Sequence, residues 1–216
     1  MGSIVQELQR ECISRDIPIT DLLRKAFLVS KKLKQNDILT WVINEMNGYT
    51  QDQADNIPSY RKLTGSVKAF NPYHGWQPIM FEDVETVKAL SEKMCFQSAS
   101  EIEHLLENSI PNGIFEMPFD GKTTQNIMDA LSTKLIPSLH VQAAQLYKII
   151  DSIRNTLLNW ALQLEDDSII GDEVSFTNEE IKKASSDTYN ITNFYGNVSE
   201  SQVQQGTDGS KQEFKK

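Results

Sequence analysis

Cysteine and histidine are scarce in this chain of 216 residues. Only Cys12 and Cys95 are present, with His74, His104 and His140 as the only histidines. Neither CxxC spacing nor a Cys/His grouping of the kind that binds zinc occurs, and two distant cysteines do not suggest a disulfide framework. We therefore expect free thiols in a reducing compartment, and neither a metal site nor a cofactor.

Long apolar runs are missing as well. No stretch reaches the roughly 18 apolar residues that a membrane-spanning helix requires. Residues 1–16 contain acidic side chains and no apolar segment of a signal peptide. Gln6 stands where an N-myristoylation signal would have Ser or Thr. These absences predict a cytoplasmic protein without a membrane span or lipid anchor.

Positive charge is in deficit. Lys and Arg number 21 against 30 Asp and Glu, which leaves a formal net charge of −9. Such a chain repels phosphate backbones, so general nucleic-acid binding is disfavoured. The GxSxG, Walker, GxGxxG and HExxH motifs are absent too, which removes the usual sequence support for hydrolase, kinase and dinucleotide chemistry. The sequence therefore leans away from an enzyme.

What the sequence does contain is helical periodicity. Three segments near the N-terminus repeat apolar residues every three or four positions, and each follows a residue that can cap a helix. These caps are Ser3, Thr20 and Asn36, and Gly48 is suited to end the third helix. The sequence thus predicts a three-helix unit over residues 1–48, with helices at 4–13, 21–34 and 37–47.

Further helices are predicted in the middle of the chain. Residues 83–96 have helical spacing, and Ser98 with Glu101 forms a capping box in front of the next helical segment. We interpret these two segments as a helical hairpin. Another helical pattern occupies residues 123–134 and ends before Pro137.

A small β region separates the helical parts. From Tyr49 to residue 80, proline and glycine punctuate short stretches such as YRKLTGSVKAF and GWQPIM, which are typical of a small sheet or hairpin. The segment GIFEMPF, residues 113–119, adds one more short strand. The expected fold class is therefore α+β and mainly α.

The strongest periodic signal lies between Ser138 and Asp166. This stretch contains neither Pro nor Gly, so we predict one long helix there. Its apolar residues follow heptad spacing, and such a seam needs a partner. Packing against the same domain is favoured because further apolar residues widen the face, and a homotypic bundle is the alternative. The seam consists of Leu139, Ala143, Leu146, Ile150, Ile153, Leu157, Trp160 and Leu164.

The composition changes after Leu164, because no Leu, Met, Cys or Trp follows it. We place a boundary near Gly171. Thr177 and Glu180 have the spacing of a capping box for one short helix beyond it. The expected parts are a helical domain over 1–170, a linker with a short helix over 171–184, and a polar tail over 185–216.

Two segments of the chain have a distinctive pattern: LLRKAFLVSKKLKQNDILTWVINEMNGY with the following IPSYRKLTGSV, and NWALQLEDDSIIGDEVSFTNEE. They resemble the AbiTii domain, a family found in bacterial abortive-infection and other phage-defence proteins. Together they cover about residues 3–184. The resemblance implies a role in phage defence, in which the infected cell is shut down before the phage matures, and it brings no catalytic residues. The matching features are Leu23-Arg24-Lys25, Lys32-Leu33, Trp41, Glu45-Met46-Asn47-Gly48-Tyr49, Tyr60-Arg61, Gly65, Trp160, Leu162, Leu164-Glu165, Gly171 and Phe176.

Five residues are candidates for a ligand pocket. Arg24, Lys25, Glu45 and Arg61 could converge between the second and third predicted helices and the first strand. His74 lies in a turn rich in aromatic residues and proline. A structural ion-pair network is the favoured interpretation of the charged cluster. A ligand-sensing pocket is the alternative, because the planar fork of Arg can grip a carboxylate or phosphate.

The tail has a β-prone pattern of its own. Side chains alternate from Tyr189 to Tyr195 and again from Val198 to Val203, and Gly196-Asn197 supplies a tight turn between them, which predicts a β-hairpin or β-arch. Asn, Gln and aromatic residues with little charge and no proline are typical of cross-β stacking. NFYGNVSESQVQQG also resembles the short amyloid signalling motifs of fungal and bacterial immune proteins, and a disordered tail is the alternative. The candidate assembly residues are Tyr189, Ile191, Phe194, Gly196, Val198, Val203 and Gly206.

These observations predict an abortive-infection protein that acts through oligomerisation or protein partners. Its tail would be the assembly motif, and a second protein of the same defence system is a further possible partner. The alternative is a toxic enzyme, a nuclease or other hydrolase, or a ligand-sensing domain. Its site would be built around Arg24, Glu45 and Arg61, with His74 nearby.

Overall fold

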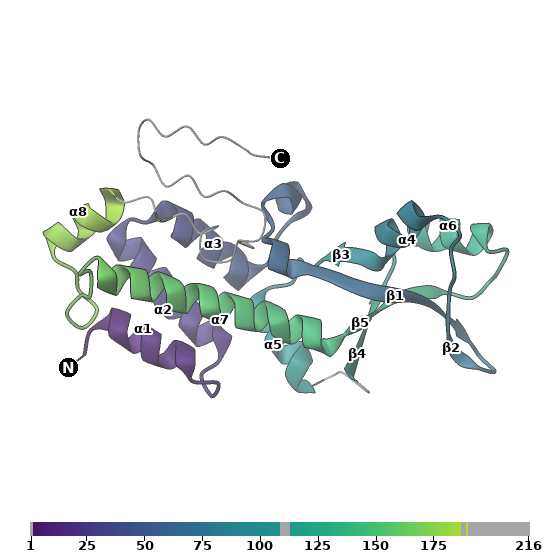
Figure 1. The fold of residues 1–216 in the computed structure, drawn as a ribbon, viewed down its shortest axis with the longest axis horizontal. Coiled ribbons are helices and arrows are strands. Elements are labelled where there is room, and N and C mark those ends of the chain that lie inside the picture. Colours follow the sequence, from purple (N-terminus) through teal and green to yellow (C-terminus); the bar gives the residue numbers. More distant parts are fainter. Residues whose placement is uncertain (1, 109–112, 187–188, 190–216) are drawn as a thin grey trace, which may run out of the picture.

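The computed structural model describes residues 2–108, 113–186 and 189. Figure 1 shows a helical region organised along one long helix, with a β-sheet that extends from one end of it. Helices dominate and a small antiparallel sheet accompanies them, so the predicted α+β, mainly α fold class is confirmed.

Three helices occupy the N-terminal part of the chain, as the sequence predicts. Each of them buries an apolar stripe, with Leu8, Leu22 and Val42 among the residues that are fully removed from solvent. Two short 3-10 turns then lead to the sheet. The helices are α1 (Ile4–Ile13), α2 (Ile19–Leu33) and α3 (Asn36–Asn47), and the turns are η1 (Gln51–Asn56) and η2 (Ser59–Arg61).

The predicted N-caps are only partly correct. Ser3 caps α1, since its hydroxyl accepts a hydrogen bond from the N–H of Gln6 at 3.3 Å. The prediction is wrong for Thr20, because α2 begins directly after Pro18. It is also wrong for Asn36, which is the first residue of α3 itself. Local sequence therefore located these two helices but not the residues that precede them.

Gly48 ends α3 as expected, and the structure shows why glycine is needed. Its φ of +83° lies in the region that disfavours residues with a Cβ. A Cβ atom at this position would also lie 2.8 Å from the carbonyl oxygen of Phe96. The chain can therefore turn here only because the side chain is absent.

In the described part of the chain, five antiparallel strands form the sheet, in the order β2-β1-β5-β4 with β3 paired to the start of β1. Leu139 lies opposite Val67 in the register of β5 and β1. Both side chains join the core together with Ile127 from a helix that packs on β5. The strands are β1 (Lys62–Asn71), β2 (Gly75–Pro78), β3 (Glu92–Met94), β4 (Ile114–Pro118) and β5 (Pro137–Gln142).

The predicted helical hairpin over the middle of the chain is wrong. Helix α4 (Val84–Ser91) packs on β1 and β3, whereas α5 (Ala99–Asn108) packs on α2, α3 and the long helix α7 (Ala143–Asp166). Residues 92–94, expected to continue the first helix, form β3 because they pair with residues 62–64. The capping box before α5 is confirmed, since Ser98 and Glu101 exchange backbone-to-side-chain hydrogen bonds of 2.8 and 3.2 Å.

The long C-terminal helix is present but starts later than predicted. Residues 137–142 form β5, a strand with neighbours on both sides, and α7 runs from Ala143 to Asp166. Leu139, the first member of the predicted seam, therefore belongs to the sheet. The shorter helix α6 (Gly121–Ala130) lies between β4 and β5 in the chain and packs on β5.

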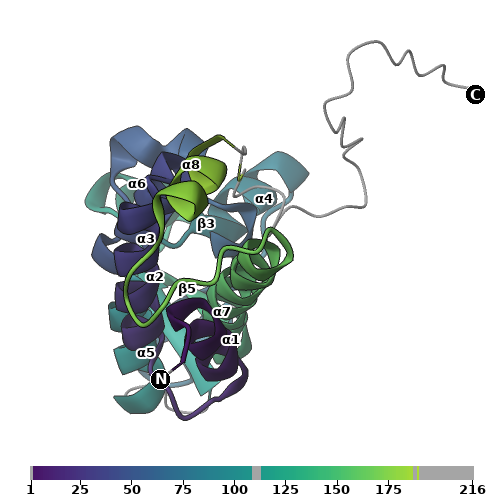
Figure 2. The ribbon, with the colours of Figure 1, turned by 90° about the vertical axis from the view of Figure 1, so that its left-hand side faces the viewer.

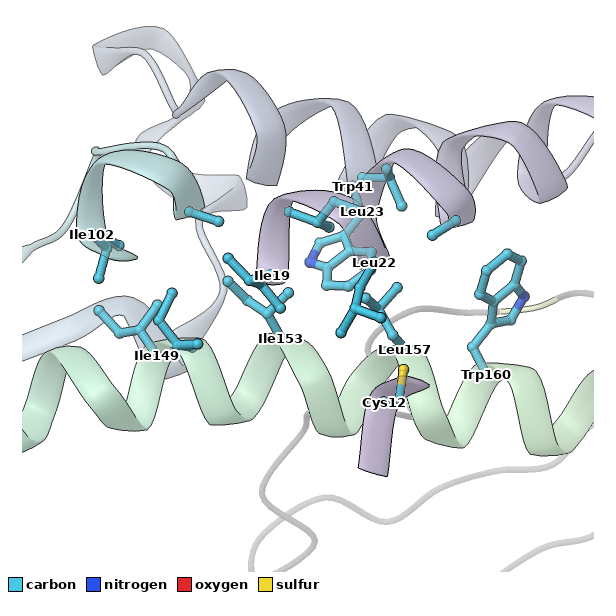
Figure 3. Packing of buried hydrophobic residues seen from close by; sticks show 14 of the residues in the cluster. Cys12, Ile19, Leu22, Leu23, Trp41, Ile102, Ile149, Ile153, Leu157 and Trp160 are labelled. Atoms are coloured by element: carbon cyan, nitrogen blue, oxygen red, sulfur yellow. The ribbon is translucent and has the colours of Figure 1, made fainter. Parts of the chain in front are cut away.

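The apolar seam of α7 packs inside the domain, so the intramolecular interpretation is confirmed. Helices α1, α2 and α5 all contact α7. Figure 3 shows Ile149, Ile153, Leu157 and Trp160 projecting from α7 into the packed interior. Trp160 is fully buried, and its indole N–H donates to the side-chain oxygen of Gln35 at 2.9 Å.

Candidate functional site

Glu45 and Arg61 form an ion pair that is completely buried. Arg61 Nε donates to Glu45 Oε1 at 3.1 Å, and Nη2 pairs with the other carboxylate oxygen. The hydroxyls of Tyr49 and Tyr60 donate to the same carboxylate at 2.8 and 2.6 Å. Glu45 comes from α3 and Arg61 from η2, so the pair joins the N-terminal helices to the start of the sheet.

Two further N–H donors of Arg61 bond to backbone carbonyl oxygens. Nη1 donates to the carbonyl oxygens of Cys95 at 3.0 Å and Gln97 at 2.6 Å. Four of its five N–H donors are thus used within the domain. Burial would lower the pKa of Arg61, but the Glu45 carboxylate outweighs it and raises the pKa. This geometry is that of a structural ion pair with satisfied hydrogen bonds.

The other three pocket candidates lie elsewhere. Arg24 is exposed on α2 and pairs with Asp21 at 3.1 Å. Lys25 contacts Glu7 and Glu11, each at 2.6 Å, and so joins α2 to α1. His74 lies exposed in the turn between β1 and β2. The expected convergence is therefore limited to Glu45 and Arg61, because the buried side of α2 is apolar and its charged residues point away.

A groove of about 430 Å³ opens between α5, α7 and the connection from α1 to α2. Two of its charged groups support the connection: Arg154 donates to the carbonyls of Ser14 and Ile17, each at 2.7 Å, and Glu103 accepts from the N–H of Ile19 at 2.8 Å. Sequence reasoning missed this groove because its walls come from three distant segments. It is lined by Arg15, Glu103, Leu106, Glu107, Tyr147, Ile150, Asp151 and Arg154.

His140 is a buried polar residue that the sequence did not single out. It lies on β5 against Trp76, with ring centroids 4.4 Å apart. Burial lowers its pKa. Among the residues that the structure describes, its Nε2 atom has no hydrogen-bond partner. In the same residues, no group of three or more His, Cys, Asp or Glu side chains is arranged to hold a metal ion.

The segment from Gly171 to Tyr189, which we call the strap, connects α7 to the part of the tail that follows Tyr189. It contains α8 (Asn178–Ser186), and Figure 2 shows the chain leaving α7 and crossing to this helix. The predicted capping box is confirmed, because Glu180 accepts from the N–H of Thr177 at 2.8 Å and returns an N–H to its hydroxyl at 3.2 Å. The same carboxylate also accepts from the N–H groups of Ile170 and Gly171 at 3.0 and 2.9 Å.

Two buried residues of the strap also anchor it to the domain. Helix α8 packs on α2, with Ala184 buried and its carbonyl accepting from the side-chain amide of Gln35 at 3.4 Å. Tyr189 is 7% exposed, and its hydroxyl donates to Asp167 at 2.6 Å. The other candidate assembly residues lie outside the described part of the chain: Ile191, Phe194, Gly196, Val198, Val203 and Gly206.

The strap should loosen as the pH falls. Burial would raise the pKa of Glu180, but the hydrogen bonds from Thr177, Gly171 and Ile170 outweigh it and hold the pKa below its ordinary value. A carboxylate with a lowered pKa stabilises the fold above its unfolded-state pKa of about 4.3, and this contribution is lost as the pH falls through the folded-state pKa. Hydrogen-exchange protection factors of α8, relative to α7, should therefore decrease between about pH 6 and pH 3.

Glu180→Gln is the matched control for this titration, because an amide does not ionise in this range. The variant should show weaker protection of α8 already at pH 6 and a smaller further decrease below it. Identical pH dependence in both proteins would contradict the role of Glu180.

Comparison with known proteins identifies the family. The AbiTii family model matches residues 3–189, which is most of the chain and ends at the residue that anchors the strap. No curated protein and no solved structure matches the chain. None of the helices in the described residues has the length and apolar character needed to cross a bilayer. The chain belongs to the AbiTii family, which connects it to abortive infection and defence against phage.

Proposed function

We propose that this protein produces abortive infection by self-association, with the tail after Tyr189 as the assembly motif. The observation that carries the proposal is that a polar segment follows the end of the family match. The family match ends at Tyr189, and the following residues have a different composition, rich in Asn, Gln, Ser and Gly. The domain is thus a folded unit to which a β-prone segment is appended. A partner protein of the same defence system is a second possible target of this segment.

Self-association follows from the chemistry of the tail. A single hairpin is marginal in water, so the alternating residues need a sheet edge or copies of themselves. Asn and Gln side chains that stack in register bond to their own copies, which makes assembly of identical chains favourable. The net charge of the whole chain, −9, opposes close approach of the domains. The tail must therefore supply the attraction.

The enzyme alternative has less support from the geometry. Glu45 and Arg61 are fully buried and bonded to each other and to their surroundings, whereas Arg24 and His74 are exposed in different places. The groove beside α5 and α7 is lined by none of these four side chains. The groove beside α5 and α7 is the place where a ligand-sensing function would be sought.

Removing the tail should abolish protection while the domain stays folded. We expect a chain that ends at Asn190 to keep its helical circular dichroism and its melting temperature, and to lose protection against phage. The residue at which the shortened chain ends affects its stability. A chain that ends at Asp172 would lose the hydrogen bonds of Glu180 and the buried side chain of Tyr189, and would be destabilised for that reason alone.

A point substitution within the full chain provides the control. Phe194→Pro removes a backbone donor and should block in-register pairing, so it should also abolish protection. A peptide spanning residues 187–210 should form β-rich assemblies that bind amyloid dyes, and the Pro variant of the peptide should remain monomeric. Protection by the shortened chain, together with a peptide that stays monomeric at high micromolar concentration, would overturn the proposal.

A further inference from the structure

Tyr189 belongs to two patterns at once. It is the last residue of the family domain, and its ring is buried with the hydroxyl bonded to Asp167. It is also the first residue of the alternating pattern that we assign to assembly. While the strap is docked, the assembly segment therefore starts at the surface of the domain, with no spacer between the two.

The absence of a spacer conflicts with the dimensions of a cross-β stack. Chains in such a stack repeat every 4.7–4.8 Å or so. A domain of this length is about 40 Å across by the usual scaling of size with chain length. Neighbouring domains are thus about eight times wider than the space that the stack allots to each chain, so they must spread outward around it.

The required spread can be estimated. Consider a cylinder around the stack that passes through the domain centres. A domain about 40 Å wide covers about 1,600 Å² of this cylinder, whereas each chain adds only about 4.8 Å to the height of the stack. The domain centres must then lie at a radius of about 50 Å. Their surfaces lie about 30 Å from the axis, beyond the reach of a tail that begins to pair directly after Tyr189.

Release of the strap would provide the missing length. The stretch from Gly171 to Tyr189 can extend to about 60 Å at about 3.3 Å per residue. It would still be joined covalently to the end of α7. The released strap therefore satisfies the geometry of the stack, and the docked strap does not.

We propose that the strap is a latch on assembly: docked on α2 and Asp167 it prevents tails from stacking, and undocked it becomes the linker that permits stacking. This latch rests on the proposed function, because it regulates the same tail. Its contacts suit such a role. Of the described strap residues, only Ala184 and Tyr189 are fully buried, and Phe176 and Ile181 are partly buried against the core, whereas the helices of the core bury continuous apolar faces. Segments with few buried apolar contacts open at lower free energy than the core does.

The test uses the full chain with a substitution that releases α8 and leaves the tail unchanged. Ala184→Glu places a carboxylate where the native side chain is 1% exposed. Burying an unpaired charge is costly, so the population with a released strap should rise at least about tenfold. Ser185→Glu is the matched control, because it adds the same charge at the next position, which is exposed. Dye-binding assembly should start about tenfold faster in the first variant only.

A second variant tests the spacing argument without disturbing the latch. Insertion of about twenty Gly and Ser residues after Tyr189 leaves the strap docked but adds a flexible spacer of about 25 Å root-mean-square length. The spacer should accelerate assembly even though hydrogen exchange shows α8 still protected. This variant keeps the proposal testable if Ala184→Glu destabilises the whole domain.

The outcomes separate the latch from the proposed function. A peptide of residues 187–210 that does not assemble would overturn the function itself. If the peptide assembles but the wild type, Ala184→Glu and the spacer variant assemble at equal rates, the latch alone is wrong. Faster assembly of both variants, with Ser185→Glu like the wild type, is the result that we expect.

Discussion

Ile153→Asp should unfold the domain or bring it close to unfolding. Ile153 is fully buried on α7, in the packed interior between α7 and the helices that contact it. The substitution removes an apolar side chain and places a carboxylate where water cannot reach it. We expect a loss of about 5 kcal/mol or more, which is comparable to the total stability of a typical domain.

Thermal unfolding followed by circular dichroism measures this loss. Asn155→Asp is the matched control, because it adds the same carboxylate to an exposed position two residues further along α7. Its melting temperature should stay within a few degrees of the wild type, since surface substitutions change stability by about 0.5 kcal/mol or less. Equal melting temperatures for the two variants would show that α7 does not pack as described.

Breaking the buried ion pair should have the second largest effect. Arg61→Met leaves the Glu45 carboxylate without its cation and the carbonyls of Cys95 and Gln97 without their donor. Glu45→Leu leaves a guanidinium without its counter-ion and removes the carboxylate to which the hydroxyls of Tyr49 and Tyr60 donate. Removing one partner of a buried pair typically costs about 3–5 kcal/mol, much of it from the charge left behind.

The double variant makes this prediction specific. Replacing both residues removes both charges, so the Glu45→Leu and Arg61→Met combination should be less destabilised than the sum of the two single losses. Chemical denaturation of the four proteins gives the coupling free energy. Additive losses would contradict a direct interaction. Loss of phage protection at unchanged stability would instead favour the ligand-sensing alternative.

Features with a local cause were predictable from the sequence. The capping boxes at Ser98 and Glu101, and at Thr177 and Glu180, join residues three apart, so their hydrogen bonds follow from the spacing. Gly48 ends α3 because only glycine tolerates its backbone conformation and its close contact. The apolar stripe from Leu146 to Leu164 lies on a buried helix, as predicted, because helical periodicity is also a local feature.

Features that depend on residues far apart in the chain were not predictable from the sequence. The stretch from Ser138 to Gln142 has apolar residues that fit either a helix or a buried strand, and pairing with β1 decides between them. Residues 92–94 likewise form a strand because they pair with the start of β1. Pairing partners some thirty or seventy positions away cannot be detected in a short window of sequence. The predicted helices therefore extended into both segments.

The sequence by itself determined the helical elements, the AbiTii family and the change of composition beyond the domain. The tertiary structure alone decided that Arg61 meets Glu45 in the interior, and that Arg24 and Lys25 face away. It also decided that Tyr189 docks on Asp167. The physical reason is the range of the interactions. Helix periodicity and caps act within a few residues, whereas burial and ion pairing depend on which distant segments the fold brings together.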